Sequence, residues 1–226
     1  MICPVCGGGE FTSMSVLWPQ LINDWQLSDA EVSYINRQQG EFCKICRCNL
    51  RSLALCEAIR AYYYTDILFK DLVLSEAARR TSLLEINEAG NLTPFLKYFG
   101  GYVFGAYPEV DIHQLPYADD SFDLVVHSDT LEHVPNPIHA LSECRRVLRL
   151  GGALCFTVPI VVGRLSRSRE GLRKSYHGNQ STLQDDWAVQ TEFGSDAWTY
   201  ILEAGFSSFS VYTVQYPSAI AFLARK

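Results

Sequence analysis

Two pairs of cysteines near the start of the chain have the spacing of metal ligands. Cys3 and Cys6 form the first Cys-x-x-Cys pair, and Cys43 and Cys46 form the second. Four thiolates in two short turns can surround one Zn²⁺ ion as a tetrahedron, and such a closed site leaves no position for a reactive water. The pattern therefore predicts a structural zinc ion. A pair of disulfides, or thiols without a ligand, is the alternative.

The elements around these pairs predict a small N-terminal unit. Ser28 and Glu31 have the spacing of a capping box, which predicts one helix between the two pairs. We expect a zinc-ribbon-like subdomain over residues 1–50 and linking helices over residues 51–80. Cys48 is ambiguous as a ligand, whereas the remaining cysteines lie in apolar patterns typical of core packing: Cys56, Cys144 and Cys155.

Polar residues follow two apolar runs in the middle of the chain. Residues 83–86 have the pattern of a buried strand that enters a turn at residues 87–90, and residues 122–126 have the same pattern before His127, Ser128 and Asp129. Strands, turns and helices at this spacing predict βαβ units, whose ligands bind at the carboxyl ends of the strands. The fold class is α/β: a Rossmann-like, doubly wound, mostly parallel sheet that ends in an antiparallel C-terminal hairpin.

Three motifs occur in order within this region: Leu-Pro-Tyr-x-Asp-x-Ser-Phe-Asp-Leu-Val-Val at 115–126, Leu-Glu-His-Val at 131–134, and Arg-Val-Leu-x-x-Gly-Gly at 146–152. Together they resemble class I S-adenosylmethionine (SAM) dependent methyltransferases over roughly the last two-thirds of the chain. Similar methyltransferases with an N-terminal double Cys-x-x-Cys form a recognisable subgroup. The resemblance implies a methyltransferase domain at residues 81–226, SAM as cofactor and methyl transfer to a small-molecule acceptor.

The first glycine loop departs from the family pattern Glu-x-Gly-x-Gly-x-Gly. The residues at the matching positions that we assign to SAM are Glu85, Asn87, Ala89 and Gly90. Asn tolerates a left-handed backbone and Ala is small, so we expect that the backbone can still approach the methionine end of SAM.

The resemblance implies further SAM contacts at the ends of later strands. Asp111 is expected to accept a hydrogen bond from the adenine amino group, with Ile112 over the ring, although a turn-forming role for Asp111 stays open. Tyr107 and Glu109 are candidates for the ribose region and could equally be loop surface. Ser128 and Asp129 complete the predicted cofactor residues.

The segment after the fifth predicted strand, residues 160–193, is expected to form an acceptor-side arm. Its cations Arg164, Arg167, Arg169, Arg173 and Lys174 lie within residues 164–174, where Glu170 is the only acidic residue, which favours an anionic acceptor, or else marks a solvated loop. Arg164, Arg167, Tyr176 and His177 are the predicted substrate-binding residues. His177 is the preferred acid–base residue, and the other catalytic candidates are Asp129 and His133.

Composition narrows the classes of function. The chain has 226 residues, 48% of them apolar, and a net charge of −6, which supports a buried core and argues against a general nucleic-acid binder. The sequence suggests no signal peptide, and its longest apolar run contains Pro159, so we expect a cytoplasmic protein. The alternative to an enzyme is a non-catalytic scaffold of the same fold that binds a partner through the zinc ribbon. The sequence does not indicate an oligomeric state.

Overall fold

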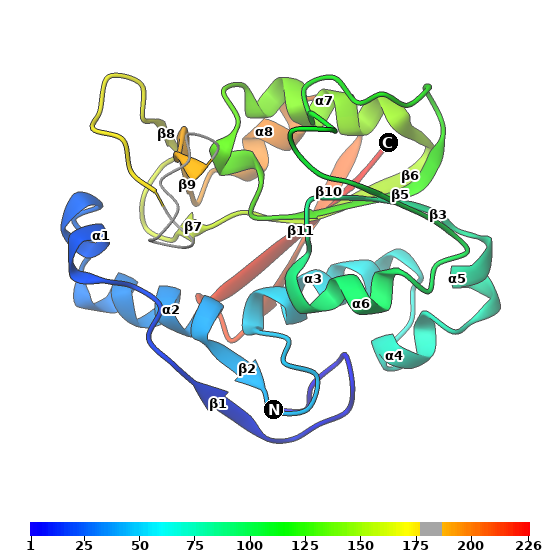
Figure 1. Cartoon of the computed structure of the whole chain (residues 1–226), viewed down its shortest axis with the longest axis horizontal. Coiled ribbons are helices and arrows are strands. Elements are labelled where there is room, and N and C mark those ends of the chain that lie inside the picture. Colours follow the sequence, from blue (N-terminus) through cyan, green and yellow to red (C-terminus); the bar gives the residue numbers. More distant parts are fainter. Residues whose placement is uncertain (177–186) are drawn as a thin grey trace.

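The computed structural model describes residues 1–176 and 187–226, which build a six-stranded sheet with helices on both faces (Figure 1). The strand order is β10-β11-β6-β5-β3-β4. The three consecutive pairings β4/β3, β3/β5 and β5/β6 are parallel, and β11 and β10 are added antiparallel. The predicted fold class is confirmed. The strands are β3 (Ser82–Ile86), β4 (Gly101–Gly105), β5 (Phe122–Ser128), β6 (Leu148–Thr157), β10 (Ser208–Val214) and β11 (Ala219–Arg225).

Two apolar layers hold helices against the sheet. On one face, buried residues of the long helix α3, with Leu53, Ala54 and Ile59 among them, pack with Leu83, Leu124 and other sheet residues. The opposite face packs against α7 and α8. The helices of the first face are α3 (Leu50–Tyr62), α4 (Phe69–Leu72), α5 (Glu76–Arg80) and α6 (Thr93–Leu96), which follows the single turn η1 (Gly90–Leu92). Those of the second are α7 (Pro137–Val147) and α8 (Trp198–Glu203), with the turn η2 (Leu131–His133) before α7.

Local capping sets where several helices begin. Asn136 accepts a hydrogen bond from the His139 backbone N–H and is followed by Pro137, so α7 begins at Pro137. Asn49 caps α3 through the Ser52 N–H. Within the predicted linking segment 51–80, two short helices follow α3, because Ser75 accepts a hydrogen bond from the Ala78 N–H and so begins α5 as a new helix after α4.

The N-terminal segment contains two helices where one was predicted. Strands β1 (Phe11–Ser13) and β2 (Glu41–Cys43) pair antiparallel, and helices α1 (Pro19–Asp24) and α2 (Asp29–Gly40) lie between them in sequence. The predicted capping box is present, since Ser28 Oγ accepts from the Glu31 N–H and the Glu31 carboxylate accepts from the Ser28 N–H. These helices lie beside the small sheet of the arm, whose strands are β7 (Ile160–Val161), β8 (Arg167–Ser168) and β9 (Thr191–Gly194).

None of the helices in the described residues is long and apolar enough to cross a membrane.

One histidine is buried inside the sheet. His127, near the end of β5, has no exposed surface, and its ring lies against Phe156 with 5.0 Å between ring centroids. Neither ring nitrogen has a hydrogen-bond partner within the described part of the chain. Burial lowers the pKa of His127 to about 3, because a cationic ring would lose its hydration there. His127 is therefore a neutral core residue.

This burial predicts a pH dependence of folding. The pKa of this histidine is near 6.5 in the unfolded chain and lower in the folded protein. Its contribution to the free energy of unfolding is therefore complete above pH 6.5, and it decreases as the pH is lowered, because the unfolded chain then takes up a proton that the folded protein does not bind. We expect this residue alone to reduce the free energy of unfolding by about 2 kcal/mol between pH 7 and pH 5. Urea titrations at pH 7 and pH 5 measure this change. The free energy of unfolding should fall by about 2 kcal/mol less in His127→Leu than in wild type, whereas a variant of the exposed His139, His139→Gln, should show the same fall as wild type. Equal slopes for wild type and His127→Leu would contradict the assignment.

Candidate functional site

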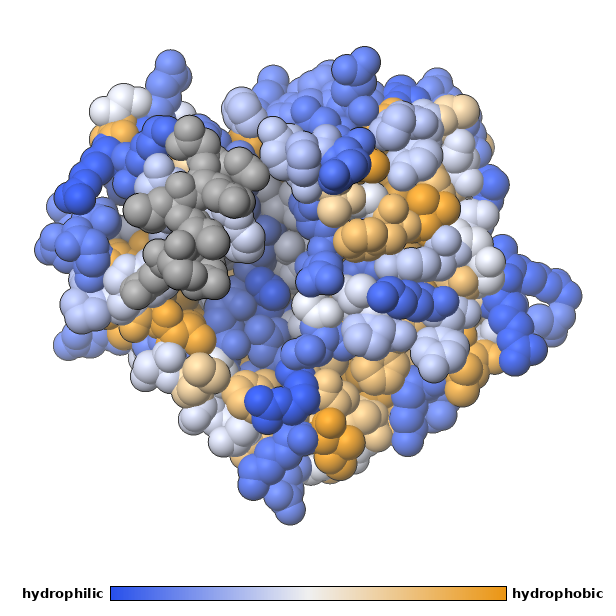
Figure 2. All heavy atoms as spheres, viewed as in Figure 1, coloured by the Kyte–Doolittle hydropathy of each residue, from blue (hydrophilic) through white to orange (hydrophobic). Residues whose placement is uncertain are grey.

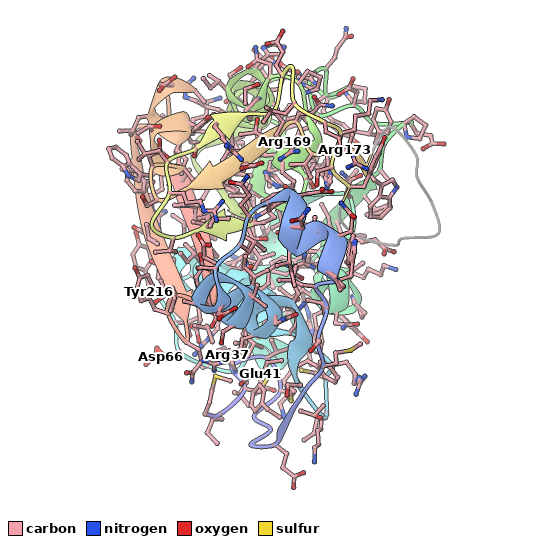
Figure 3. All side chains as sticks on the ribbon, turned by 90° about the vertical axis from the view of Figure 1, so that its left-hand side faces the viewer. Arg37, Glu41, Asp66, Arg169, Arg173 and Tyr216 are labelled. Carbon is pink, nitrogen blue, oxygen red and sulfur yellow. The ribbon has the colours of Figure 1, made fainter. Side chains whose placement is uncertain are left out.

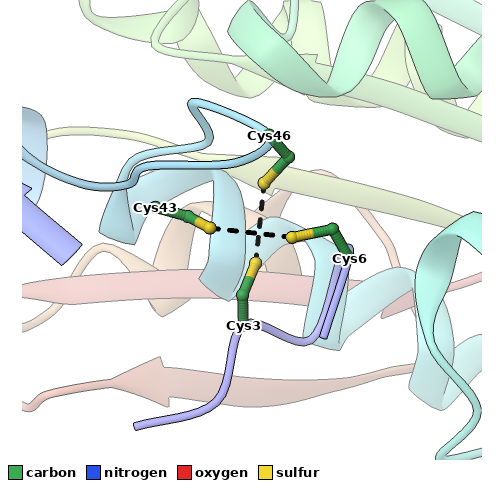
Figure 4. A group of neighbouring side chains, drawn as sticks. All are labelled: Cys3, Cys6, Cys43 and Cys46. Carbon is green, nitrogen blue, oxygen red and sulfur yellow. Dashed lines mark hydrogen bonds between the residues drawn. The ribbon is translucent and has the colours of Figure 1, made fainter. Parts of the chain in front are cut away.

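The two Cys-x-x-Cys pairs meet at one point (Figure 4). The sulfur atoms of Cys3, Cys6, Cys43 and Cys46 all lie within 4.8 Å of one another. Cys3 Sγ lies 3.6 Å from Cys46 Sγ, and Cys6 Sγ lies 3.6 Å from Cys43 Sγ. The hydrogen bond with Cys46, together with burial, raises the pKa of the Cys3 thiol. The predicted set of four residues therefore forms a compact cluster that joins residues more than 35 positions apart in sequence.

The geometry of this cluster fits a tetrahedral metal better than disulfides. A zinc ion with four Zn–S bonds of about 2.3 Å separates its sulfurs by about 3.8 Å, whereas a disulfide needs about 2.05 Å. The Gly8 backbone N–H donates to Cys6 Sγ over 3.4 Å, as amides around metal thiolates do. Cys48 lies outside the cluster, and its Sγ donates to the Asn91 carbonyl.

A cavity of about 1170 Å³ opens at the carboxyl ends of β3, β4 and β5. One half is lined by residues of the sheet edge, and the other half by the N-terminal helices and the arm. The sheet-edge residues include Ile86, Asn87, Glu88, Gly90, Phe104, Tyr107, Asp111, Ile112, Ser128, Asp129 and Thr130. Figure 2 shows this face of the molecule hollowed near its middle, with hydrophobic residues on both sides.

The altered glycine loop keeps the backbone that its position requires. Asn87 is left-handed at φ 56°, as expected for an Asn at this position, and Gly90 is left-handed at φ 58°. The Asn87 side chain accepts from the Tyr107 backbone N–H over 3.1 Å and lies 3.4 Å from Thr130 Oγ1. This amide therefore fixes the loop against the ends of β4 and β5, while both Asn87 and Gly90 line the cavity.

Glu85 and Ala89 do not line the cavity, contrary to the prediction that they contact the cofactor directly. Both are fully buried. The Glu85 carboxylate accepts from the Ala89 N–H over 2.8 Å, from Tyr102 OH over 2.6 Å and from Thr93 Oγ1. A buried carboxylate is stable only when its oxygens are hydrogen-bonded, so Glu85 acts by holding the loop in shape.

The predicted adenine and ribose residues divide into two groups. Tyr107, Asp111 and Ile112 line the cavity, whereas Glu109 does not and is exposed. The Asp111 carboxylate accepts from the His113 N–H over 2.8 Å and contacts His113 Nδ1 at 3.1 Å. Its side chain is 49% exposed, so the carboxylate still faces open space in the cavity. The ribose assignment of Glu109 is not supported by its position.

Asp129 connects the sheet to the N-terminal part of the chain. Its carboxylate accepts from Gln39 Nε2 over 2.7 Å, from Thr157 Oγ1 over 3.0 Å and from Arg51 Nη1. The neighbouring Ser128 hydroxyl shares a 2.8 Å hydrogen bond with Thr157. Since the Asp129 carboxylate is paired with a guanidinium, it is better suited to organise the cavity than to take a proton.

Of the two histidines predicted to be catalytic, His133 lies within the described residues and His177 does not. His133 lines the cavity, its Nδ1 lies 3.3 Å from the Ala188 carbonyl, and its ring is edge-on to Trp187. His177 lies outside the described residues. Tyr176 is half-buried in an isolated bridge with Ala188 and is not among the residues that line the cavity.

The arm is not the unopposed basic surface that its sequence suggested. Arg164 pairs with Glu31 of α2, with hydrogen bonds of 2.6 and 2.7 Å, and this contact lowers the pKa of the Glu31 carboxyl to about 2. Arg167 and Arg169 both pair with Glu192. The sequence interpretation missed these carboxylates because Glu31 is remote in the chain and Glu192 lies at the far end of the arm.

The position of these cations argues against their predicted role. Arg164 and Arg167 line a separate small cavity of about 190 Å³ and not the large one. Figure 3 shows Arg169 and Arg173 near α1, at the opposite end of the N-terminal helices from Arg37 and Glu41. The arginines therefore fasten the arm to the N-terminal helices and to itself, which removes the basis for predicting an anionic acceptor.

Arg51 is a cavity residue that the sequence interpretation missed. It lies in α3, and its Nη2 is 3.4 Å from the place that a Cβ at Gly90 would occupy. Its Nε is buried and has no hydrogen-bond partner in the described residues. Nη2, which lies beside the glycine loop, suits an anionic group of a bound cofactor. The other residues of this helix have the apolar pattern of a core helix, so the sequence did not indicate a role for Arg51 in the cavity.

Known proteins resemble parts of this chain. Residues 91–156 match a family described as "Methyltransferase domain". A 2-methyl-6-phytyl-1,4-hydroquinone methyltransferase of Oryza sativa subsp. japonica is 40% identical over 52 residues, which is 23% of this chain and 16% of that protein. A probable S-adenosylmethionine-dependent methyltransferase of Mycolicibacterium smegmatis is 34% identical over 92 residues, 38% of this chain and 32% of that protein. The chain thus spans less than a third of the length of these relatives.

Among solved structures, the trans-methyltransferase CalH in complex with S-adenosylhomocysteine (SAH) is similar to this chain with a TM-score of 0.46 and 15% sequence identity. The similarity covers 91% of this chain and 62% of that chain. The family match begins directly after the glycine loop at Gly90 and ends within β6, so it contains β4, β5 and the residues at their carboxyl ends. The match over residues 91–156 therefore shows that this part of the chain, less than half of its length, is similar to a methyltransferase domain.

Proposed function

We propose that this protein transfers a methyl group from SAM to a small-molecule acceptor. The observation that carries the proposal is the single cavity that collects Asn87, Gly90, Asp111, Ser128 and Asp129 at the ends of three adjacent parallel strands. Its volume of about 1170 Å³ exceeds the range of about 300–1,000 Å³ typical of a pocket for one drug-sized ligand, so a cofactor and an acceptor could share it. The methyltransferase names of the relatives support the same activity.

The residues present fit the cofactor. Bound SAM would supply an electrophilic methyl group, and transfer requires an in-line approach of the acceptor. The left-handed Asn87 and Gly90 let the backbone come close to the methionine end, and Arg51 can meet its carboxylate. Asp111 would accept from the adenine amino group, with Ile112 against the ring. His133 lines the cavity, and its imidazole can accept a proton from the acceptor.

A scaffold without activity is the competing function. The altered glycine loop was the sequence feature in its favour, because only Gly90 of the family's glycines remains. Asn87 nevertheless takes the left-handed conformation, and Glu85 has all the donors it needs to hold the loop. The loop geometry therefore supports cofactor binding, and with it the enzyme.

Two acidic residues offer a matched test of the cofactor site. Asp111→Ala should weaken SAM binding about 5- to 150-fold, the equivalent of about 1–3 kcal/mol for the loss of a hydrogen-bond partner. Glu109→Ala removes a carboxylate two positions earlier that does not line the cavity, and it should leave the affinity unchanged. Isothermal titration calorimetry with SAM measures both. An unchanged affinity in Asp111→Ala would show that the adenine assignment is wrong, and no binding by wild type would favour the scaffold.

The histidines are tested by turnover once an acceptor is identified. The position of His133 in the cavity supports it as a general base, and His177 stays a prediction from the sequence. We expect His133→Asn to lower kcat about a hundredfold, the usual scale for loss of a general base, with an unchanged Kd for SAM. His177→Asn is measured beside it. Near-normal turnover by His133→Asn, with a large loss in His177→Asn, would move the role to His177.

We also propose that the cluster of Cys3, Cys6, Cys43 and Cys46 holds one structural Zn²⁺ ion. The support is the donor set and the sulfur separations, which leave no open ligand position. Because the two pairs flank the segment that contains α1 and α2, the metal would fasten both ends of that segment.

Metal content tests this centre directly. Purified wild type should contain about one equivalent of zinc per chain. Cys43→Ser should lose most of it, because a three-thiolate site binds more weakly and must be completed by another ligand. Cys48→Ser, five residues along and outside the cluster, is the control and should retain the metal. Wild type with well under one equivalent, or equal loss in both variants, would contradict the proposal.

A further inference from the structure

The half of the cavity away from the glycine loop is apolar. Its residues come from the N-terminal helices and the segment before them, and from the arm. They are Val16, Leu17, Trp18, Leu21, Trp25, Leu27 and Ile35 on the N-terminal side and Ile160, Val161 and Trp187 on the other. Leu21, Trp25, Val161 and Val189 also form a small buried cluster of their own, so this wall is a packed surface with its own core.

The charges around the cavity are unfavourable for an anion. Among its described lining residues, Arg51 is the only Lys or Arg, and it is paired with Asp129. Three carboxylates line the same space: Glu88, Asp111 and Asp129. The undescribed residues 177–186 contain no Lys or Arg in the sequence. An anionic acceptor would therefore lose its hydration without gaining a cation.

Polar groups are present where the two halves of the cavity meet. His133, Thr130 and Gln39 line it together with the apolar wall. Trp187 lies edge-on to His133, with 6.4 Å between ring centroids, and so connects the apolar wall to the candidate base. This arrangement can hold an apolar body on one side and one hydroxyl or similar group beside His133. Large apolar pockets with a few polar groups bind ligands of this kind.

We propose that the methyl acceptor is a neutral, mainly apolar molecule with a hydroxyl or similar nucleophile, held against the wall formed by the α1–α2 segment and Trp187. The proposal deepens the proposed function and rests on it. It replaces the anionic acceptor expected from the arm, whose arginines are paired with Glu31 and Glu192.

A matched pair of probes separates charge from shape. 1-Naphthol and 1-naphthyl phosphate share one ring system, but the phosphate is an anion at neutral pH. Binding of each to the full chain in the presence of S-adenosylhomocysteine (SAH) is measured by calorimetry or by tryptophan fluorescence. We expect 1-naphthol to bind at least about tenfold more tightly than 1-naphthyl phosphate, because the phosphate would lose hydration without gaining a full set of hydrogen bonds. Tenfold is the effect on affinity expected for one such polar group. Equal or tighter binding of 1-naphthyl phosphate would overturn the proposal.

Two matched pairs of variants test the location. Leu17→Gln changes a half-buried residue that lines the cavity, and Ile22→Gln changes a half-buried residue five positions along that does not. Trp187→Ala and Trp198→Ala remove tryptophans that are 41% and 40% exposed, of which only Trp187 lines the cavity. The first member of each pair should weaken 1-naphthol binding about fivefold or more, with the control within about twofold. Equal effects within both pairs would overturn the location.

SAH affinity is the second readout in every variant. It should stay within about twofold of wild type, because none of the four positions belongs to the sheet-edge half of the cavity. If wild type fails to bind SAH, the proposed function itself is wrong. If wild type binds SAH but shows no preference for 1-naphthol, the methyltransferase assignment stands and only the apolar acceptor is overturned.

Discussion

The carboxylate of Asp129 is the contact on which the arrangement of the cavity depends. It is 8% exposed and accepts hydrogen bonds from three separate elements: Gln39 in α2, Arg51 in α3 and Thr157 at the end of β6. A buried carboxylate is costly unless such partners are present, so the charge at the end of β5 requires the N-terminal part of the chain to stay docked there. Asp129 itself has a left-handed backbone at φ 48°, which turns the chain out of β5.

This docking makes the Cys-x-x-Cys segment part of the site. Further contacts hold its two helices to the arm: Arg164 pairs with Glu31, Trp25 Nε1 donates to Ser175 Oγ over 2.7 Å, and Tyr34 OH lies 3.3 Å from the Val162 carbonyl. Removing one partner of such a buried polar pair leaves the other without a hydrogen bond, which typically costs about 1–3 kcal/mol. The segment between the two cysteine pairs is therefore a wall of the cavity rather than a separate appendage.

Local signals in the sequence predicted much of the fold. The apolar runs of β3 and β5 and the capping box at Ser28 each depend on neighbouring residues, and all are present. The left-handed Asn87 was also expected from its residue type. The four-cysteine cluster could be predicted because ligand spacing is a strong constraint even when two pairs are far apart in sequence.

The residues that the sequence did not reveal depend on tertiary contacts. Arg51 and Gln39 lie on helices and acquire a role only when both reach Asp129. The arm seemed basic because Glu31, the partner of Arg164, is 133 positions away. Glu109 was the nearest carboxylate after β4 in sequence, yet the chain carries it away from the cavity and brings Asp111 to it. Charge counted along a segment does not show which charges remain unpaired after folding.

A crystal structure of the protein with SAH tests most directly whether the docked N-terminal segment and the sheet edge form one site. We predict that the homocysteine end of SAH lies beside Asn87, Gly90 and Arg51, that its adenine lies by Asp111 and Ile112, and that α2 remains in contact with Asp129. The wall around Trp18 and Leu21 should then border the remaining open space next to the sulfur. SAH bound away from the glycine loop, or bound only after Gln39 and Arg51 have left Asp129, would contradict this description of the site.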